Sequence, residues 1–433
     1  MNNLNIILIY LILLISENLT AQSGWVQQNG NISKNLSDVF FVNDQKGWIV
    51  TDSSMILSTS NGGLTWSQQT LPYYSPLNTV FFINENTGWV AGGYYYIAHF
   101  GVIYKTTNGG NNWFLLTYSG EIQNICFVNE NTGFIALNGS GDFTSGGHIS
   151  KTINGGLSWT GEPSNTEFKS ISFRNNDTGF AIGVYWNDTG YDTSYVYRTT
   201  NSGNNWEKKY KENSYPIYSN ALKDVCVKGN KVWASGYSSS MLFSSDNGET
   251  WGSQILPVPC QTNSIYFVDQ FTGWAVGSGF SDSTNINKTT NGGVNWINQR
   301  NNFPSWLNSV MFINYYTGWA VGRYGVILRT TNGGLTFAEN SFSESPTLYY
   351  LSQNYPNPFN PVTNLGFGIS DLGFVSLKLY DAIGKELRTL VNESRPAGNY
   401  NIEFDGSDLP SGIYFYKFEV GDFVETKSMI LLK

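Results

Sequence analysis

Short runs of apolar residues recur along this chain, and clusters of glycine, asparagine and aspartate separate them. In one stretch the runs are residues 80–83, 89–91, 102–104 and 113–116. Runs of three or four residues between turn-forming clusters are typical of β-strands. The pattern predicts an inner, a second, a third and an outer strand in each unit. The continuous apolar runs of the inner strands predict sheets that are packed on both faces.

An eight-residue motif recurs between the third and outer strands of these units. It reads Ser/Thr-x-Asn/Asp-x-Gly-x-x-Trp, and its copies end at intervals of 41 to 47 residues, the spacing of four-stranded propeller blades. We expect the Asn or Asp side chain to bond the backbone two residues on, the glycine to take a positive φ, and the aromatic residue to be buried. The Asn or Asp and the closing aromatic of the seven copies are Asn61 and Trp66, Asn108 and Trp113, Asn154 and Trp159, Asn201 and Trp206, Asp246 and Trp251, Asn291 and Trp296, and Asn332 and Phe337.

This motif resembles the Asp-box of sialidase-type propellers, and the fifth copy, residues 244–251, has the strict form. A second motif, Thr-Gly-Trp-x-x-Gly, is seen at Gly88-Trp89 and Gly273-Trp274. Together the two motifs look most like the propellers of the photosystem II assembly-factor family. The resemblance covers residues 24–340 and implies an all-β, seven-bladed β-propeller.

Residues 25–28 resemble the outer strand at residues 66–69, although no copy of the motif precedes them. The chain therefore has eight candidate outer strands for seven blades. We expect residues 25–28 to pair in the last blade and close the ring, because closure removes an open sheet edge.

The repeat stops near residue 340, and four prolines follow between residues 346 and 361, which indicates a domain boundary. Beyond it the pattern predicts a small Ig-like β-sandwich of antiparallel strands. Its expected strands are residues 365–369, 375–380, 386–391, 400–404, 413–420 and 424–431.

Ordered motifs in this second region, at residues 354–361, 379–384, 409–416 and 427–433, resemble the type A C-terminal sorting domain of the bacterial type IX secretion system. The resemblance implies that residues 355–433 are recognised by the type IX secretion machinery. It also implies a protein that is secreted or held at the outer-membrane surface of a Gram-negative bacterium. An ordinary Ig-like sandwich without a sorting role is the alternative.

The apolar run at residues 6–15 is too short to span a bilayer, and Leu19-Thr20-Ala21 fits a cleavage site. We predict a signal peptide at residues 1–21, a propeller at 22–340, a linker at 341–354 and the sorting domain at 355–433. An uncleaved N-terminal anchor is the alternative, because no Lys or Arg precedes the run. After cleavage we expect no transmembrane span.

The net charge of −8 disfavours nucleic acid as a partner, because phosphate backbones need a basic surface. Three cysteines do not form a disulfide framework. Two alternatives are open: a disulfide between Cys226 and Cys260, or three buried free thiols at Cys126, Cys226 and Cys260.

No recognisable catalytic set is present, and we expect no metal or cofactor. A sialidase-like site needs three converging arginines, but Arg198 and Arg329 share a repeat column with lysines, which indicates a structural role. Other glycosidases need only two carboxylates about 5–9.5 Å apart. Aspartates also gather in loops because they tolerate turns, and two histidines alone are a weak indication of zinc. The acidic candidates are Asp142, Asp188, Asp192 and Asp282, and the histidines are His99 and His148.

The loops between second and third strands, and those from an outer strand to the next inner strand, carry the length variation and are rich in aromatic residues, which suits contact with a ligand. The favoured function is a non-catalytic propeller that binds glycan or protein. An extracellular glycan-active hydrolase is the alternative, and a factor that assists assembly of a membrane complex is a third, weaker one. The candidate ligand-face aromatics are Tyr74, Tyr95, Trp186, Tyr191, Tyr215 and Trp306.

Overall fold

Seven antiparallel sheets make up the first of two units, Met1–Phe337 and Ala338–Lys433, in this computed structural model. Each unit is considered by itself. The structure describes residues 24–95, 99–139, 147–161, 164–186, 192–214, 221–236, 240–258, 260–279, 284–299, 303, 305–334, 349–395 and 398–433. The expected signal peptide lies outside these residues and stays a prediction.

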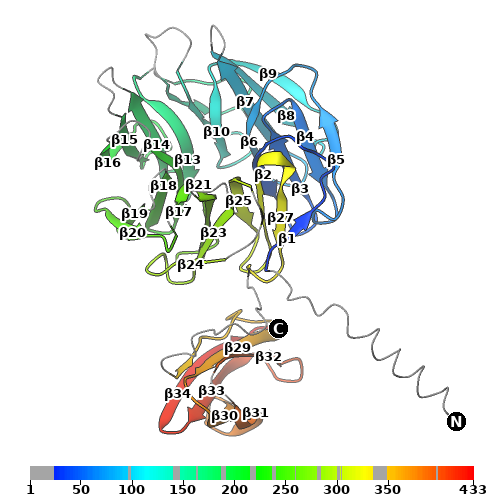
Figure 1. Ribbon diagram of the computed structural model, residues 1–433, viewed down its shortest axis with the longest axis vertical. Coiled ribbons are helices and arrows are strands. Elements are labelled where there is room, and N and C mark those ends of the chain that lie inside the picture. Colours follow the sequence, from blue (N-terminus) through cyan, green and yellow to red (C-terminus); the bar gives the residue numbers. More distant parts are fainter. Residues whose placement is uncertain are drawn as a thin grey trace, which may run out of the picture. The chain divides into compact units, whose positions relative to one another are not determined.

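Each sheet is one blade of a propeller, with its first strand nearest the centre (Figure 1). In order from the centre outward, the strands are β2 (Leu36–Phe41), β3 (Gly47–Thr51), β4 (Met55–Thr59) and β5 (Ser67–Thr70) in blade one; β6 (Leu77–Phe82), β7 (Gly88–Tyr95), β8 (His99–Thr106) and β9 (Phe114–Ser119) in blade two; β10 (Ile122–Phe127), β11 (Gly133–Leu137) and β12 (Ile149–Thr152) in blade three; β13 (Glu167–Phe173), β14 (Gly179–Trp186), β15 (Asp192–Thr199) and β16 (Glu207–Ser214) in blade four; β17 (Leu222–Lys228), β18 (Lys231–Gly236), β19 (Ser240–Ser244) and β20 (Gly252–Ile255) in blade five; β21 (Cys260–Phe267), β22 (Gly273–Gly279), β23 (Thr284–Thr289) and β24 (Ile297–Asn298) in blade six; and β25 (Leu307–Phe312), β26 (Gly318–Gly322), β27 (Ile327–Thr330) and β1 (Val26–Gln28) in blade seven.

The ring is closed by the first strand of the chain. The inner strands contact one another in a complete cycle, in which β25 also contacts β2. Strand β1 pairs with β27, with Val26 opposite Arg329 and Gln28 opposite Ile327. The predicted seven-bladed propeller and its closure by residues 25–28 are therefore confirmed.

Aromatic residues join one blade to the next in a repeated arrangement. Between blades one and two, the Trp48 ring stacks on Phe82 with 3.4 Å between centroids, and Trp48 Nε1 donates to Gly109 O at 3.2 Å. The other face of Phe82 covers Gly88, where any Cβ would lie about 2.4 Å from the ring. Trp113 meets the same phenylalanine edge-on, with 6.0 Å between the ring centroids. The glycine of the Thr-Gly-Trp motif thus leaves room for a phenylalanine of its own blade. The tryptophan of the motif stacks on the phenylalanine of the next blade.

The turn motifs differ from expectation in two details, although in the seventh copy Asn332 Oδ1 does accept from Gly334 N, two residues on, at 3.1 Å. In the first copy Thr59 Oγ1 accepts from Gly63 N at 2.9 Å, and Asn61 Oδ1 accepts from the backbone N–H of Thr65, four residues on rather than two. The glycine has the expected positive φ, 91° at Gly63. The closing aromatics were expected to be buried, but most are only partly buried, because they lie at the outer end of each seam. The fully buried tryptophans are Trp25, Trp48, Trp89, Trp233, Trp274 and Trp319.

Burial along the strands also corrects one prediction. Inner strands such as β2 and β10 alternate between buried and partly buried residues, because one of their faces looks toward the centre of the ring. The second strands β3, β11 and β26 are buried at every position. Packing on both faces of the sheet therefore begins at the second strand of each blade.

The second unit is a two-sheet sandwich, as predicted (Figure 1). One sheet has the order β28 (Tyr350–Leu351), β29 (Val362–Ile369) and β32 (Gly398–Asp405), and the other has β31 (Glu386–Arg395), β30 (Gly373–Tyr380), β33 (Gly412–Val420) and β34 (Phe423–Leu431). Their facing side chains form one hydrophobic core that includes Phe367, Leu377 and Tyr416.

The three cysteines are free thiols, so no Cys226–Cys260 bridge forms. Cys226 and Cys260 are buried in one hydrophobic cluster, whereas Cys126 is partly buried. Burial raises the pKa of Cys126 to about 12 and that of Cys226 to about 11. These thiols are therefore uncharged at neutral pH.

Candidate binding face

Because the strands of each blade are antiparallel, successive connections lie alternately on the two faces of the propeller. The repeated turns join third to fourth strands and lie on one face, which we call the turn face. The loops between second and third strands, and the connections from one blade to the next, lie on the other, which we call the loop face. The variable loops that carry the candidate aromatics therefore share one face.

The structure describes only part of the predicted aromatic set. Tyr74 is 73% exposed in the connection into blade two, and Trp306 is partly buried in the connection into blade seven. Tyr95 and Trp186 end strands β7 and β14, but their side chains lie outside the description, as do Tyr191 and Tyr215 altogether. The structure therefore places two of these side chains on separate connections.

The candidate acidic residues are described even less. Asp142, Asp188 and Asp282 lie outside the described residues, and so does the side chain of Asp192 at the start of β15. The His99 side chain is likewise outside, whereas His148 is described and partly buried. Among the described residues, no group of three or more His, Cys, Asp or Glu side chains could hold a metal ion.

All seven inner strands carry a β-bulge at the loop-face end, where the register shifts. A bulge redirects its extra residue. We call these seven residues the loop-face ring, and every one of them is polar and partly buried. They are Ser37, Asn78, Gln123, Lys169, Lys223, Asn263 and Asn308.

Amides of the loop-face ring bond from one blade to the next. Asn78 Nδ2 donates to Ile122 O, and Asn308 Nδ2 donates to Leu36 O, both at 2.8 Å. Asn263 Nδ2 donates to a carbonyl of β25 in the same way. The ring is therefore held in place by backbone of the neighbouring strands.

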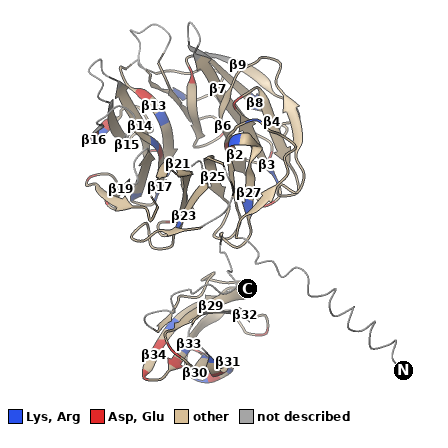
Figure 2. Ribbon diagram, viewed as in Figure 1, with Lys and Arg blue, Asp and Glu red and all other residues tan. Residues whose placement is uncertain are grey.

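On the loop face, the charges of Lys169 in blade four and of Arg323 in blade seven act on Lys223 in blade five. Charged positions are otherwise sparse on the propeller (Figure 2). Lys223 Nζ donates to the neutral amide of Asn263 at 2.7 Å. Burial, followed by the nearby charges of Lys169 and Arg323, lowers the pKa of Lys223 to about 8. Lys169 is paired with Glu167 at 2.9 Å, so part of its charge is offset. An acidic group bound here would relieve the repulsion among the cations.

Arg323 belongs to the short 3₁₀ turn η1 (Arg323–Gly325) that follows β26. Its guanidinium lies 3.7 Å from the ring centre of Trp306, close enough for a cation–π contact. A candidate aromatic is thus joined to the cationic side of the loop-face ring. This arrangement offers an aromatic surface and a positive charge at one place.

The residue after each bulge forms a second polar layer. Asp38 Oδ2 accepts from Val80 N at 2.9 Å, and its Oδ1 accepts from Ser309 Oγ at 2.7 Å. Asp224, in the equivalent position of blade five, accepts from Ile265 N at 2.9 Å. Burial raises the pKa of Asp38 to about 6. These carboxylates link neighbouring blades and accept backbone N–H groups, which indicates a structural role.

The cations near the turn face are also structural. Arg198 Nη1 donates to Asn247 O at 2.7 Å and lies 2.6 Å from a carboxylate oxygen of Glu249. Lys105 and Lys288 donate to turn carbonyls of the next blade, each at 3.1 Å. The expectation of a structural column before each turn is confirmed for these residues.

In the second unit, the sequence motifs meet along the edge of the last strand. Phe359 N donates to Ile430 O at 2.9 Å, and Asn357 Oδ1 accepts from Ile430 N at 2.8 Å. Asn354 N donates to the Tyr416 hydroxyl at 2.6 Å. The proline-rich segment therefore covers the edge of β34 and is fixed to β33.

The fold and these motifs define an exported β-propeller protein with a sorting domain. A profile described as "Photosynthesis system II assembly factor YCF48" matches residues 17–185 and 94–281, which together span more than half of the 433 residues. The chain belongs to this family. A profile described as "Secretion system C-terminal sorting domain" matches residues 353–432. The second unit is a type IX sorting domain, and the protein is secreted or carried to the cell surface.

Solved structures agree with the propeller fold. One titled "YCF48 bound to D1 peptide" is 18% identical, covers 71% of this chain and 97% of its own, and has a TM-score of 0.55. Another, "YCF48 from Cyanidioschyzon merolae", is 18% identical, covers 71% and 98%, and has a TM-score of 0.52. No curated protein matches the sequence. In the part of the chain that the structure describes, no helix has the length and apolar character needed to cross a membrane.

Reasoning from the sequence missed the loop-face ring. Its signal is a repeat column that is polar in all seven blades and follows an apolar residue in most of them, for example Asn78 after Leu77 and Lys223 after Leu222. Aligning the inner strands by the repeat would have exposed this column. Only the structure shows that the charges of Lys169 and Arg323 act on Lys223.

Proposed function

We propose that this protein is a non-catalytic, exported propeller that binds a segment of another protein at its loop face. A carboxylate of that segment would lie beside Lys223, with Arg323 and Trp306 next to it. The observation that carries the proposal is the group of cations Lys169, Lys223 and Arg323 at the loop face, where burial, followed by the charges of Lys169 and Arg323, lowers the pKa of Lys223 to about 8. Such a cluster is stabilised when an anion binds.

The comparison with solved structures supports a peptide as the ligand. A propeller of similar fold has been solved with a peptide bound, according to its title. A role in photosystem assembly is not part of the proposal, because the sorting domain directs this chain out of the cell. The proposal therefore takes from the relative only the kind of ligand.

The test is a binding screen of the full-length protein against short peptides. The library carries acidic or neutral side chains, each in free-acid and C-terminally amidated forms. We expect binding to peptides with a free carboxylate, and the two arms separate a side-chain carboxylate from a C-terminal one. Lys223→Gln should weaken binding about tenfold, because a charge-assisted contact is lost.

Lys228→Gln is the matched control, because Lys228 lies at the other end of β17 and faces the Tyr266 ring at 5.4 Å. It should leave binding unchanged. Binding that ignores the carboxylate and both substitutions would overturn the proposal. Turnover of a glycan panel by the purified protein would instead support the hydrolase alternative, which no observation on the described residues favours.

A further inference from the structure

Blade three differs from the other six blades in its outer edge. Each of the other sheets has four strands, whereas the described residues of blade three form three. Beyond β12, Thr160 pairs with Lys151 through an isolated bridge. The sequence continues with Gly161 and Pro163, and proline has no N–H to donate to a sheet ladder. Among the described residues, blade three therefore has an isolated bridge where each of the other blades has a fourth strand.

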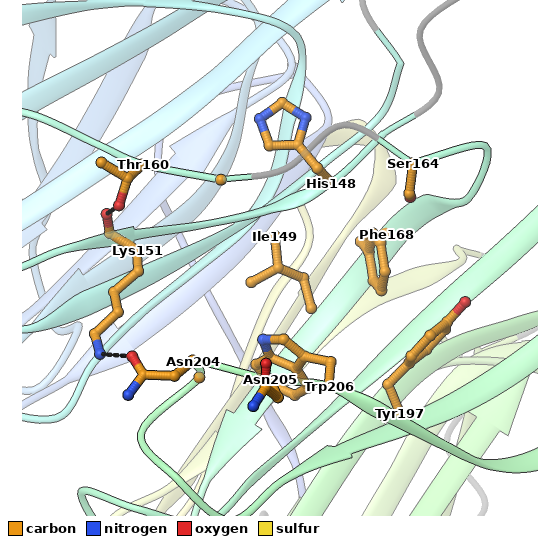
Figure 3. A pocket seen from close by; sticks show the side chains of 12 residues that line it. His148, Ile149, Lys151, Thr160, Ser164, Phe168, Tyr197, Asn204, Asn205 and Trp206 are labelled. Carbon is orange, nitrogen blue, oxygen red and sulfur yellow. Dashed lines mark hydrogen bonds between the residues drawn. The ribbon is translucent and has the colours of Figure 1, made fainter.

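Elsewhere the fourth strand covers the closing aromatic of the next blade. Leu116 on β9 and Trp159 pack against the same hydrophobic cluster, and Tyr210 on β16 lies 5.8 Å from Trp251, measured between ring centroids. Beside Trp206, the equivalent residue of blade four, the structure instead has a cavity of about 470 Å³ (Figure 3). The cavity is the direct result of the shortened edge.

The apolar wall of this cavity is aromatic. Phe168, Tyr197 and Trp206 line it together with Ile149 (Figure 3). The Tyr197 hydroxyl is held 3.3 Å from Thr166 Oγ1. The volume and the aromatic side chains in the lining are typical of small-molecule sites.

Polar groups complete the lining without adding a negative charge. Asn204 Oδ1 accepts from Lys151 Nζ at 3.0 Å, so the position of this amide is set and its Nδ2 can donate (Figure 3). Asn205 is exposed at the rim. Burial lowers the pKa of His148, so the imidazole is neutral at pH 7 and has one donor and one acceptor nitrogen. No carboxylate is present among the described lining residues.

We propose that this cavity binds a neutral hexose residue of a glycan. The aromatic rings would take the apolar face of the sugar, and the two amides would bond its hydroxyls. The Lys151 ammonium is directed to the neutral amide of Asn204 and keeps two further N–H groups that can donate to sugar hydroxyls. The site lies at the edge of blades three and four and is independent of the loop-face ring.

The test is titration of the full-length protein with glucose, galactose, mannose and N-acetylglucosamine, followed by saturation-transfer NMR and calorimetry. At least one sugar should bind saturably. Asn204→Ala and Asn205→Ala should each weaken that binding about tenfold. Both residues are exposed, so these variants should keep the fold, and an unchanged melting temperature checks this.

The matched controls are Asn111→Ala and Asn112→Ala, which alter the same repeat positions in blade two, because the preceding blade there is completed by its fourth strand β5. They should leave sugar binding unchanged, and so should Lys223→Gln. The proposal is overturned if none of the four sugars binds saturably. Equal weakening by the blade-two and blade-four variants would also overturn it.

Discussion

Single residues explain why this repeat has two tryptophan positions with different roles. Trp233, from the Thr-Gly-Trp column, is fully buried, stacks on Phe267 with 3.7 Å between centroids, and donates to Gly292 O at 3.1 Å. Trp251, from the turn motif, is partly buried and donates to Gly248 O within its own turn. The first therefore joins two blades, whereas the second closes one turn.

Replacing Trp233 by alanine should destabilise the propeller by about 3–5 kcal/mol, because a large buried ring leaves a cavity between two blades. Trp251→Ala should cost less, about 1–2 kcal/mol, because only part of its ring is removed from water. Denaturant unfolding followed by tryptophan fluorescence measures this, since all 14 tryptophans lie in the first unit. A larger loss for Trp251→Ala would contradict this assignment.

The residue scale also shows what the sequence could and could not predict. The Asn or Asp of each turn was predictable, because its chemistry is local and repeats in phase. Lys223 and Arg323 are 100 residues apart in the sequence, and no local pattern indicates that they lie near each other. Their approach depends on the curvature of the whole ring, so the cationic cluster had to be read from the structure.

At the scale of elements, closure rests on a three-residue strand. The place of the closing aromatic in blade seven is taken by Trp25, which meets Phe312 edge-on with 5.7 Å between centroids. Trp25 Nε1 also donates to Gln299 Oε1 at 3.0 Å. The resemblance of residues 25–28 to an outer strand was enough to predict this pairing. That the described residues of blade three form only three strands was not predicted, because the motif before Thr160 is intact.

Deleting residues 25–28 should lower the melting temperature of the propeller more than deleting residues 349–433 does. The first deletion exposes the edge of β27 and removes a buried tryptophan, whereas the second removes a unit with its own hydrophobic core. Scanning calorimetry of the two deletions beside the full-length protein provides the measurement. Equal melting temperatures for the two deletions would refute the role of β1 in stability.

At the scale of the whole molecule, a repeat framework and a sorting domain serve separate purposes. The turn face repeats the same hydrogen bonds in blade after blade, which stabilises the ring. The loop face carries the variable loops and the cations, and the second unit carries the export motifs. Stability, the proposed ligand contact and export are therefore assigned to different parts of the chain.

Removing residues 349–433 should stop export at the periplasm in a host with a type IX system, because the sorting domain is lost. Fusing those residues to a reporter that carries a signal peptide should move the reporter to the surface or the medium. Immunoblots of the periplasmic, surface and medium fractions measure both outcomes. Normal secretion of the shortened chain would show that another region carries the export signal.

The most direct test of the proposed function is a binding isotherm at two pH values for the free-acid peptide that binds best. With its pKa near 8, Lys223 is mostly protonated at pH 7 and mostly neutral at pH 9, while peptide carboxylates stay ionised. If binding requires the protonated lysine, affinity should fall about tenfold from pH 7 to pH 9, and Lys223→Gln should abolish this dependence. The same affinity at both pH values in the unaltered protein would contradict the account.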